Sequence, residues 1–205
     1  MIAVTGYSGF VGQQLLKQLP VKKCLLMGRV KPQTNHNFCQ LELSSNEHDD
    51  LISSLSKVTT LVHIAARVHV MSDKSTDPLS EFRIINREGT LNLARKAAKA
   101  GIKRFIFVSS IKVNGESTTQ QVPFTASDSP NPEDPYGMSK AEAEQLLLAL
   151  GKKTGMEIVI IRPPLVYGEG VKANFASLMR FVGKGLPLPF RAIKKNKRSL
   201  VSVYN

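Results

Sequence analysis

The chain has 205 residues, of which 42% are hydrophobic and 21% are charged, and its formal net charge is +12. These values are typical of a soluble protein with one domain, or with one domain and an appendage. No apolar run approaches the ~18 to 20 residues that span a bilayer, and no basic region with a cleavage site opens the sequence, so we expect a cytoplasmic protein without membrane insertion.

The positive charge is concentrated at the C-terminal end. Residues 172–205 contain eight Lys or Arg and no Asp or Glu. Such a patch suits nucleic acid, an anionic surface or a small phosphorylated ligand. Few aromatic residues lie beside it to stack on bases, and no nucleic-acid motif is recognisable, so we expect no nucleic-acid partner. Cys24 and Cys39 lie in apolar segments and the four histidines are scattered, which predicts free thiols and no metal site.

The first element in the chain is an apolar strand over residues 1–5, which leads directly into a glycine-rich turn and an apolar helical run. The glycines are Gly6, Gly9 and Gly12. They suit a tight turn, a close approach of the backbone to a pyrophosphate, and close helix packing, respectively. A helix N-terminus after such a turn offers N–H groups to phosphate. The pattern predicts a dinucleotide site, and a glycine-rich turn without a ligand is the alternative.

Three further strands follow over residues 23–27, 38–43 and 60–64, with a short amphipathic helix at 51–55 before the last of them. The first of these strands ends at Gly28-Arg29. An arginine there favours the 2′-phosphate of NADP over the ribose hydroxyls of NAD, although it can also lie flat on the adenine ring. The last strand ends in two small residues, Ala65 and Ala66, which leave room for a ligand.

The second half of the chain continues the alternation of helices and strands. It predicts a helix at 79–100, a strand at 104–108, a long loop at 116–135, a helix from Tyr136 and a strand at 157–161. Asn86, within the first helix, is either a buried hydrogen-bonding residue or a surface residue. The whole pattern predicts an α/β protein with a Rossmann-type, doubly wound parallel sheet and a ligand at the carboxyl ends of the strands.

Tyr136 and Lys140 are spaced one helical turn apart on the same helix face. A lysine ammonium there would favour the phenolate and lower the tyrosine pKa from roughly 10, which suits general acid–base catalysis. An exposed pair of side chains without a function has the same spacing. The residues that precede the pair therefore decide between these two interpretations.

Taken together, these motifs resemble the extended short-chain dehydrogenase/reductase family, in its NAD(P)-dependent nucleotide-sugar epimerase/dehydratase branch. The residues that carry the resemblance are Thr5-Gly6-Tyr7-Ser8-Gly9-Phe10-Val11-Gly12, His63-Ile64-Ala65-Ala66, Asn86, Ser109-Ser110, Tyr136-x-x-x-Lys140 and Arg162-Pro163-x-x-Val166-Tyr167-Gly168. The resemblance implies that Ser110, Tyr136 and Lys140 are catalytic and that NAD or NADP is bound. The residues implied at the cofactor are Gly6, Gly9, Phe10, Val11, Gly12, Arg29, Glu42, Leu43, Ala65, Ala66, Asn86, Ser109, Tyr136, Lys140 and Pro163.

The basic C-terminal end is similar to the segments that hold a nucleoside diphosphate in this branch. The resemblance implies a UDP-sugar substrate that contacts Ser110, Asn174, Leu188, Phe190 and Arg198. It divides the chain into a dinucleotide-binding domain at 1–170 and the start of a nucleotide-sugar-binding region at 171–205. Family members continue for about another hundred residues, about one small domain, so we expect this substrate region to be incomplete. A homodimer through the helices that flank the sheet is compatible with the family.

Two kinds of function remain open at this point. The first is a 4-epimerase or a 4-keto reductase that acts at C4 of a UDP-hexose or UDP-N-acetylhexosamine by Tyr-assisted hydride transfer. The segments at 110–118 and 186–200 look slightly more like reductases of bacterial surface-polysaccharide synthesis. The second is a non-catalytic NAD(P)-binding regulator on the same fold. Loss of Tyr136 or Lys140 would indicate the regulator, and the sequence contains both residues.

Overall fold

Six parallel strands form the centre of the N-terminal part of the chain, in the order β3-β2-β1-β4-β5-β6. This is the order of doubly wound dinucleotide-binding sheets. The predicted parallel α/β fold is therefore confirmed. The strands are β1 (Ile2–Thr5), β2 (Cys24–Gly28), β3 (Asn37–Gln40), β4 (Thr60–His63), β5 (Arg104–Val108) and β6 (Glu157–Ile161).

The structure is a computed structural model that describes residues 1–45, 50–68, 76–118, 122–171, 173–185 and 197–205. Its internal contacts divide the chain into two units, Met1–Arg162 and Pro163–Asn205, which we describe separately. The functional division into domains at residue 170 stays a prediction.

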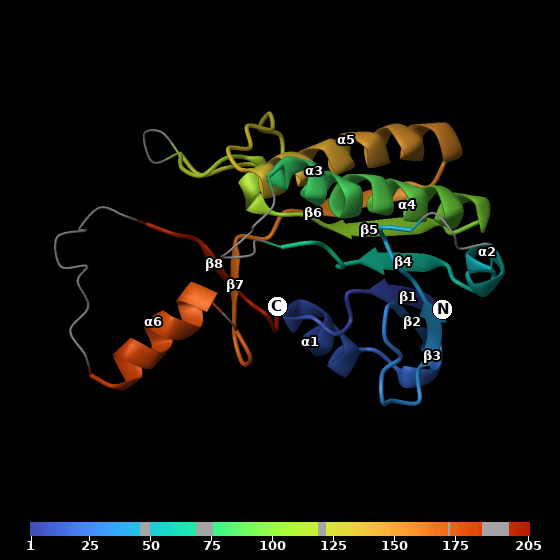
Figure 1. Cartoon of the computed structure of the whole chain (residues 1–205), viewed down its shortest axis with the longest axis horizontal. Coiled ribbons are helices and arrows are strands. Elements are labelled where there is room, and N and C mark those ends of the chain that lie inside the picture. The colour runs from blue at the N-terminus through green and yellow to red at the C-terminus, as the bar shows by residue number, and fades with distance from the viewer. Residues whose placement is uncertain (46–49, 69–75, 119–121, 172, 186–196) are drawn as a thin grey trace. The chain divides into compact units, whose positions relative to one another are not determined.

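Helices cover both faces of the sheet in the first unit, with α1 on one face and α3, α4 and α5 on the other (Figure 1). Side chains alternate between the faces because successive strand residues point in opposite directions. Leu25 and Met27 pack in the core beside α4 and α5, whereas Leu26 packs in a second core beside α1. The helical elements are α1 (Phe10–Gln18), η1 (Val21–Lys23), α2 (Leu51–Ser54), α3 (Pro78–Phe82), η2 (Arg83–Gly89), α4 (Thr90–Lys99), η3 (Ile111–Val113) and α5 (Pro135–Thr154).

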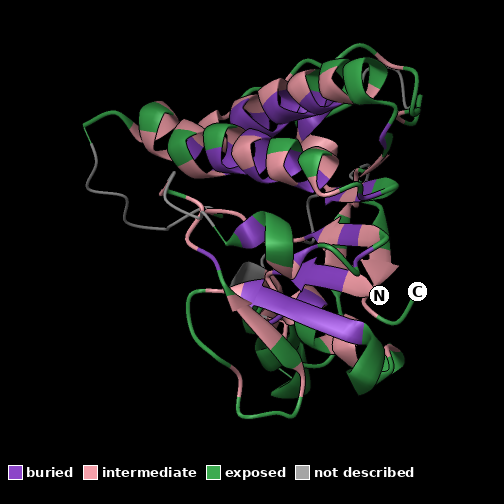
Figure 2. Cartoon of the chain, turned by 90° about the vertical axis from the view of Figure 1, so that its right-hand side faces the viewer, coloured by how far each residue is buried: buried purple, intermediate pink, exposed green. Residues whose placement is uncertain are grey.

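Burial follows this layering. In Figure 2, buried residues run along the central strands and along the faces of α4 and α5 that look toward the sheet, while their outer faces are exposed. The small residues Ala94 and Ala97 on α4, and Ala143 on α5, are almost completely buried. They let both helices approach the sheet and each other closely, and this packing holds α5 in place over the sheet.

The predicted helix at 79–100 differs from the structure in its middle. It begins at Pro78 after the cap residue Asp77, whose side chain accepts a hydrogen bond from the Ser80 N–H at 3.1 Å. Residues Arg83–Gly89 then form a π-helix before α4 begins. The wider turn shifts the side chains relative to a regular α-helix. At its end, a Cβ on Gly89 would lie 2.9 Å from the Leu43 Cβ, so the segment packs closely on the chain after β3.

The second unit contains a two-stranded parallel sheet of β7 (Leu165–Tyr167) and β8 (Leu200–Ser202), and helix α6 (Ala173–Gly183). Gly168 follows β7 with a φ of +148°, and a Cβ there would lie 2.5 Å from Val203 Cγ1. In the described part of the chain, no helix is both long and apolar enough to cross a membrane.

Candidate active site

The carboxyl ends of the central strands meet at one edge of the sheet. Thr5 pairs with Met27 on one side and with His63 on the other, and His63 pairs with Phe107. The residues that follow these strands therefore share that edge. They include the glycine turn after β1, the two alanines after β4 and the two serines after β5, which the sequence predicted as parts of one site.

The turn after β1 leaves no room for a side chain at Gly6 or Gly12. Gly6 has a φ of +71°, and a Cβ on it would lie 2.5 Å from the Ala65 nitrogen. A Cβ on Gly12 would lie 2.6 Å from the Tyr7 Cα. Gly9 is the N-cap of α1, and no side chain caps this helix end. The backbone N–H groups at the start of α1, which include those of Phe10 and Val11, thus suit a bound phosphate group.

Arg29, Glu42 and Leu43 lie where the chain leaves the neighbouring strands. The predicted strand at 38–43 ends earlier, at Gln40, although the Leu41 N–H still donates to the Gly28 carbonyl at 2.9 Å. The Arg29 Nε lies 4.0 Å from a Glu42 carboxylate oxygen, and both side chains are partly or mostly exposed. A carboxylate therefore stands beside the arginine that the sequence analysis associated with NADP.

Ala65 and Ala66 are half-buried and follow β4 without a bulky side chain at the edge. The backbone N–H groups of Ile64 and Ala65 both donate to the Thr5 hydroxyl at 3.2 Å. The turn after β4 is thereby attached to the end of β1. The Ala65 backbone packs directly against Gly6, and contact of these two alanines with a cofactor stays a prediction.

Ser109 and Ser110 follow β5 with different surroundings. The Ser109 hydroxyl is buried and has no hydrogen-bond partner among the described residues. An orphaned buried hydroxyl at this edge offers a polar contact to a ligand. Ser110 caps the 3₁₀ turn η3, where its hydroxyl accepts a hydrogen bond from the Lys112 N–H at 3.3 Å.

Tyr136 and Lys140 lie in the first turns of α5, as predicted. Lys140 is only 1% exposed, and its Nζ donates to the Val108 carbonyl at 2.9 Å. The same Nζ lies 4.4 Å from the centroid of the Phe107 ring and 5.9 Å from that of Tyr136. The lysine therefore connects the tyrosine helix to the end of β5, immediately before the two serines.

The predicted effect of Lys140 on the tyrosine is wrong for this structure. Burial raises the pKa of Tyr136 to about 12, Asp134 raises it further, and the lysine that acts in the opposite direction is Lys112. Burial also lowers the pKa of Lys140 to about 7, partly offset by Glu144. Because Lys140 is desolvated and directed at the Val108 carbonyl, it does not supply the expected favourable charge.

Asn86 is completely buried, which decides between the two interpretations of this residue. Its side-chain oxygen accepts a hydrogen bond from the Arg67 N–H at 2.8 Å, and its amide nitrogen donates to the Arg67 carbonyl at 3.0 Å. The amide also donates to the Ser139 hydroxyl at 3.0 Å, which in turn donates to the Tyr136 carbonyl at 2.8 Å. Asn86 thus supports the tyrosine helix, and contact with a cofactor stays a prediction.

The sequence analysis missed several residues that support the site. Ser139 was one, and the pairing of Arg162 with Glu144 and Asn114 was another. Arg162 makes a bidentate contact with the Glu144 carboxylate and donates to the Asn114 side chain at 3.1 Å. Asp134 was also missed, although an acidic residue before Pro135 is a typical helix-start signal.

The predicted substrate residues lie in the second unit, apart from Ser110. Arg198 is exposed just before β8. Leu188 and Phe190 lie outside the described residues, as does the side chain of Asn174. Pro163, predicted at the cofactor, is the first residue of this unit and is half-buried. Within the described ranges, no group of three or more His, Cys, Asp or Glu residues is arranged to hold a metal ion.

The fold and this edge define a dinucleotide-binding α/β protein of the short-chain dehydrogenase/reductase type, with a Ser, Tyr and Lys set at the end of the central strands. Comparison with protein families agrees with that class. Residues 2–204 match the NAD dependent epimerase/dehydratase family, and the chain belongs to this family.

The chain is also similar to individual proteins of known name. The chain is 52% identical over 207 residues to UDP-glucose 4-epimerase of Vibrio cholerae, a match that covers all of this chain and 63% of the relative. In fold, it is similar to UDP-N-acetylglucosamine 4-epimerase from Bacillus cereus, with a TM-score of 0.81, 24% identity, and coverage of 99% of this chain and 67% of the other. It is also similar to MoeE5 in complex with UDP-glucose and NAD, with a TM-score of 0.77, 26% identity, and coverage of 98% and 67%.

Proposed function

We propose that this chain carries the cofactor-binding and catalytic part of an NAD-dependent UDP-sugar 4-epimerase. The observation that carries the proposal is the convergence of the glycine turn, Ser110, Tyr136 and Lys140 at one edge of the sheet. The 52% identity to UDP-glucose 4-epimerase of Vibrio cholerae supports the reaction class. The chain spans about 63% of that relative's length, so the activity is proposed for the whole protein.

The residues present fit a bound dinucleotide. The glycine turn and the uncapped start of α1 would hold the pyrophosphate. Ala65, Ala66 and the orphaned Ser109 hydroxyl would line the rest of the site. The carboxylate of Glu42 beside Arg29 disfavours a 2′-phosphate by charge repulsion, so we propose NAD rather than NADP. Mass spectrometry of the cofactor that co-purifies with the protein would test this choice.

When bound at this site, NAD would supply the hydride acceptor for C4 of the sugar and the hydride donor for its re-reduction. The protein side of the reaction is proton transfer at the C4 oxygen. Tyr136 is the proposed acid and base, and Ser110 donates a hydrogen bond to the same oxygen. Burial raises the pKa of Tyr136 to about 12, so the tyrosine is a phenol at neutral pH. The phenol suits the step that returns a proton to the C4 oxygen, whereas removal of the C4 hydroxyl proton requires the phenolate form of the same residue.

The proposed substrate class comes from the names of the relatives, which include enzymes of UDP-glucose and of UDP-N-acetylglucosamine. The basic segment at 172–205 suits a nucleoside diphosphate, since Arg side chains bind phosphate through two parallel hydrogen bonds. Contacts of Asn174, Leu188, Phe190 and Arg198 with this substrate remain part of the proposal, and so does a role in surface-polysaccharide synthesis.

Incubation of the protein with UDP-glucose or UDP-N-acetylglucosamine, without added cofactor, tests the proposal. We expect formation of the 4-epimer, because an epimerase recovers its bound NAD in every turnover. Tyr136→Phe should reduce turnover by roughly 10²- to 10⁴-fold, the usual contribution of a general acid or base, with the co-purified NAD retained. Tyr204→Phe is the matched control, since Tyr204 is exposed.

The same measurement separates the alternatives. Turnover that requires added NADH or NADPH would indicate a 4-keto reductase. A Tyr136→Phe protein that retains cofactor and full biological activity would instead indicate the non-catalytic regulator. The presence of Tyr136, Lys140 and Ser110 in the predicted positions favours the enzyme over that regulator.

A further inference from the structure

Lys112 contacts the surroundings of both proposed catalytic hydroxyls. Its backbone N–H donates to the Ser110 hydroxyl at 3.3 Å. Its ammonium forms an ion pair with Asp134, and it also donates to Glu116 at 3.0 Å. One residue is thus attached through its backbone to the serine turn η3 and through its side chain to the residue that begins the tyrosine helix.

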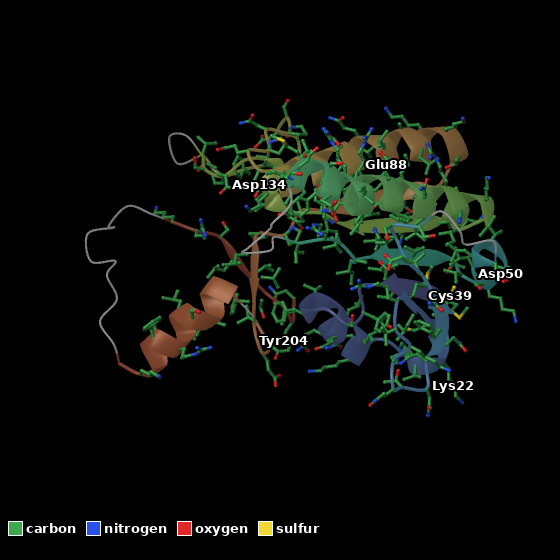
Figure 3. All side chains as sticks on the ribbon, viewed as in Figure 1. Lys22, Cys39, Asp50, Glu88, Asp134 and Tyr204 are labelled. Carbon is green, nitrogen blue, oxygen red and sulfur yellow. The ribbon has the colours of Figure 1, made fainter. Side chains whose placement is uncertain are left out.

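Asp134 is the N-cap residue of α5. Its Oδ1 accepts a hydrogen bond from the Gly137 N–H at 2.6 Å, and its carbonyl accepts one from the Met138 N–H at 2.9 Å. In Figure 3, Asp134 lies at the start of this helix. Tyr136 lies within this capped turn, so a shift of Asp134 would also shift the backbone that carries the tyrosine.

The backbones of the two segments also touch. A Cβ on Gly137 would lie 2.8 Å from the Lys112 carbonyl oxygen and 3.1 Å from Asp134 Oδ1. In the segment before α5, the Asn131 N–H donates to the Val113 carbonyl at 2.9 Å. Only glycine permits this approach of η3 to α5. The ion pair of Lys112 therefore adds to a close backbone contact. A small displacement at this contact would change the distance between the Ser110 and Tyr136 hydroxyls.

We propose that Lys112 is a positioning residue that holds the Ser110 turn and the capped first turn of α5 in one fixed relation, so that the two hydroxyls meet the same substrate oxygen. This role rests on the proposed function. It goes beyond an ordinary exposed ion pair, which contributes little to stability, because the partners are a serine cap and a helix cap on either side of the proposed reaction centre.

The charge of Lys112 has a second consequence for Tyr136. The charged groups near the tyrosine are Asp134, Lys112 and Lys140, and Glu116 lies on the other side of Lys112. Asp134 raises the tyrosine pKa, whereas Lys112 lowers it. Loss of the Lys112 charge should therefore raise the pKa of Tyr136 further.

Three variants of the full chain separate these effects. Lys112→Met removes the charge and keeps most of the apolar stem, and Lys112→Arg restores the charge. Asp134→Asn keeps a good helix cap but removes the ion pair. Lys103→Met is the control, because Lys103 is exposed before the amino end of β5, whereas Ser110 lies beyond its carboxyl end. Turnover and amide hydrogen exchange of residues 133–141 are measured for each.

For Lys112→Met and Asp134→Asn we expect exchange in residues 133–141 to become about tenfold faster, since about that factor accompanies loss of one cap-linked interaction. For Lys112→Met we also expect kcat to fall about tenfold with KM changed less than twofold. Lys112→Arg should recover most of both properties.

The proposal is overturned if Lys112→Met matches Lys103→Met in exchange and in kcat, or if Lys112→Arg is as impaired as Lys112→Met. If the unmodified protein converts no UDP-sugar, the proposed function fails. Hydrogen exchange then still decides whether Lys112 fixes the start of α5, because that measurement does not depend on turnover.

Discussion

Tyr136 and Lys140 show how a correctly predicted pair of residues can have an unexpected electrostatic environment. The helix spacing places both on α5, but the tyrosine is half-buried, and its desolvation together with the nearby Asp134 raises its pKa to about 12. Lys140 is directed at the Val108 carbonyl instead. Spacing determines which face of a helix two residues share, while burial and neighbouring charges determine their protonation.

The burial of Lys140 predicts a dependence of stability on pH. Its pKa is lowered to about 7 in the folded protein from an ordinary value of 10.5, so the unfolded chain binds more protons between these values. The folded state should therefore gain stability as the pH rises from about 7 toward 10.5, by about 2 to 3 kcal/mol between pH 6 and pH 9. Lys140→Met lacks this gain.

Urea unfolding of the unmodified protein and Lys140→Met across that pH range measures the effect. The difference in the free energy of unfolding should change with pH in the stated direction. Parallel curves for the two proteins would show that the buried lysine is not desolvated in the folded state.

Among the elements, the glycine turn and α1 are the part of the site that depends most on close packing. A Cβ on Gly12 would lie 2.6 Å from the Tyr7 Cα, so the helix cannot keep its place if a side chain is added there. This packing aims the start of α1 at the strand edge. The positions at which a Cβ would clash carry glycine in the sequence, so the turn could be predicted from the glycine spacing alone.

Gly12→Ala should displace α1 and weaken NAD binding by at least tenfold, with a loss of stability on the order of 1 to 3 kcal/mol, as is usual for overpacking. Calorimetric titration with NAD and thermal unfolding measure the two effects. Gly183→Ala in α6 is the matched control, because a Cβ there meets nothing within 4 Å. An equal NAD affinity in Gly12→Ala and the unmodified protein would contradict the proposed phosphate site.

For the first unit as a whole, His63 connects three segments that are far apart in the sequence. It is fully buried, with Nδ1 2.6 Å from the Thr5 hydroxyl and Nε2 2.9 Å from that of Thr90. It therefore joins β1, β4 and α4. His63 is thus a core histidine whose two ring nitrogens both have hydrogen-bond partners.

The same burial makes the protein sensitive to acid. Burial, and to a lesser extent Lys140, lowers the pKa of His63 to about 3, so the unfolded chain binds the extra proton between about 6.5 and 3. Stability should fall by about 2 to 3 kcal/mol between pH 7 and pH 4.5 for this reason. His63→Gln cannot take up that proton and should show a flatter pH dependence in urea unfolding, although it is less stable at pH 7. An unchanged slope would exclude His63 as the source.

The sequence by itself determined the succession of strands and helices along the chain, the glycine turn, and the residue types of the proposed catalytic set. Strands such as Arg104–Val108 and Glu157–Ile161 were predicted with their observed bounds. Such features are local, because periodicity, glycine geometry and helix-start signals depend on neighbouring residues.

Only the tertiary structure decided how these parts act on one another. Three contacts join residues that are separated by many positions in the sequence. Asn86, in the π-helical segment, donates to Ser139, and Lys140 donates to the Val108 carbonyl. Lys112, close to Ser110 in the chain, pairs with Asp134. Desolvation and charge pairing arise when such segments pack together, and a single sequence does not record which partners meet. The proposed catalytic residues are therefore readable from the chain, whereas their protonation and alignment follow from its packing.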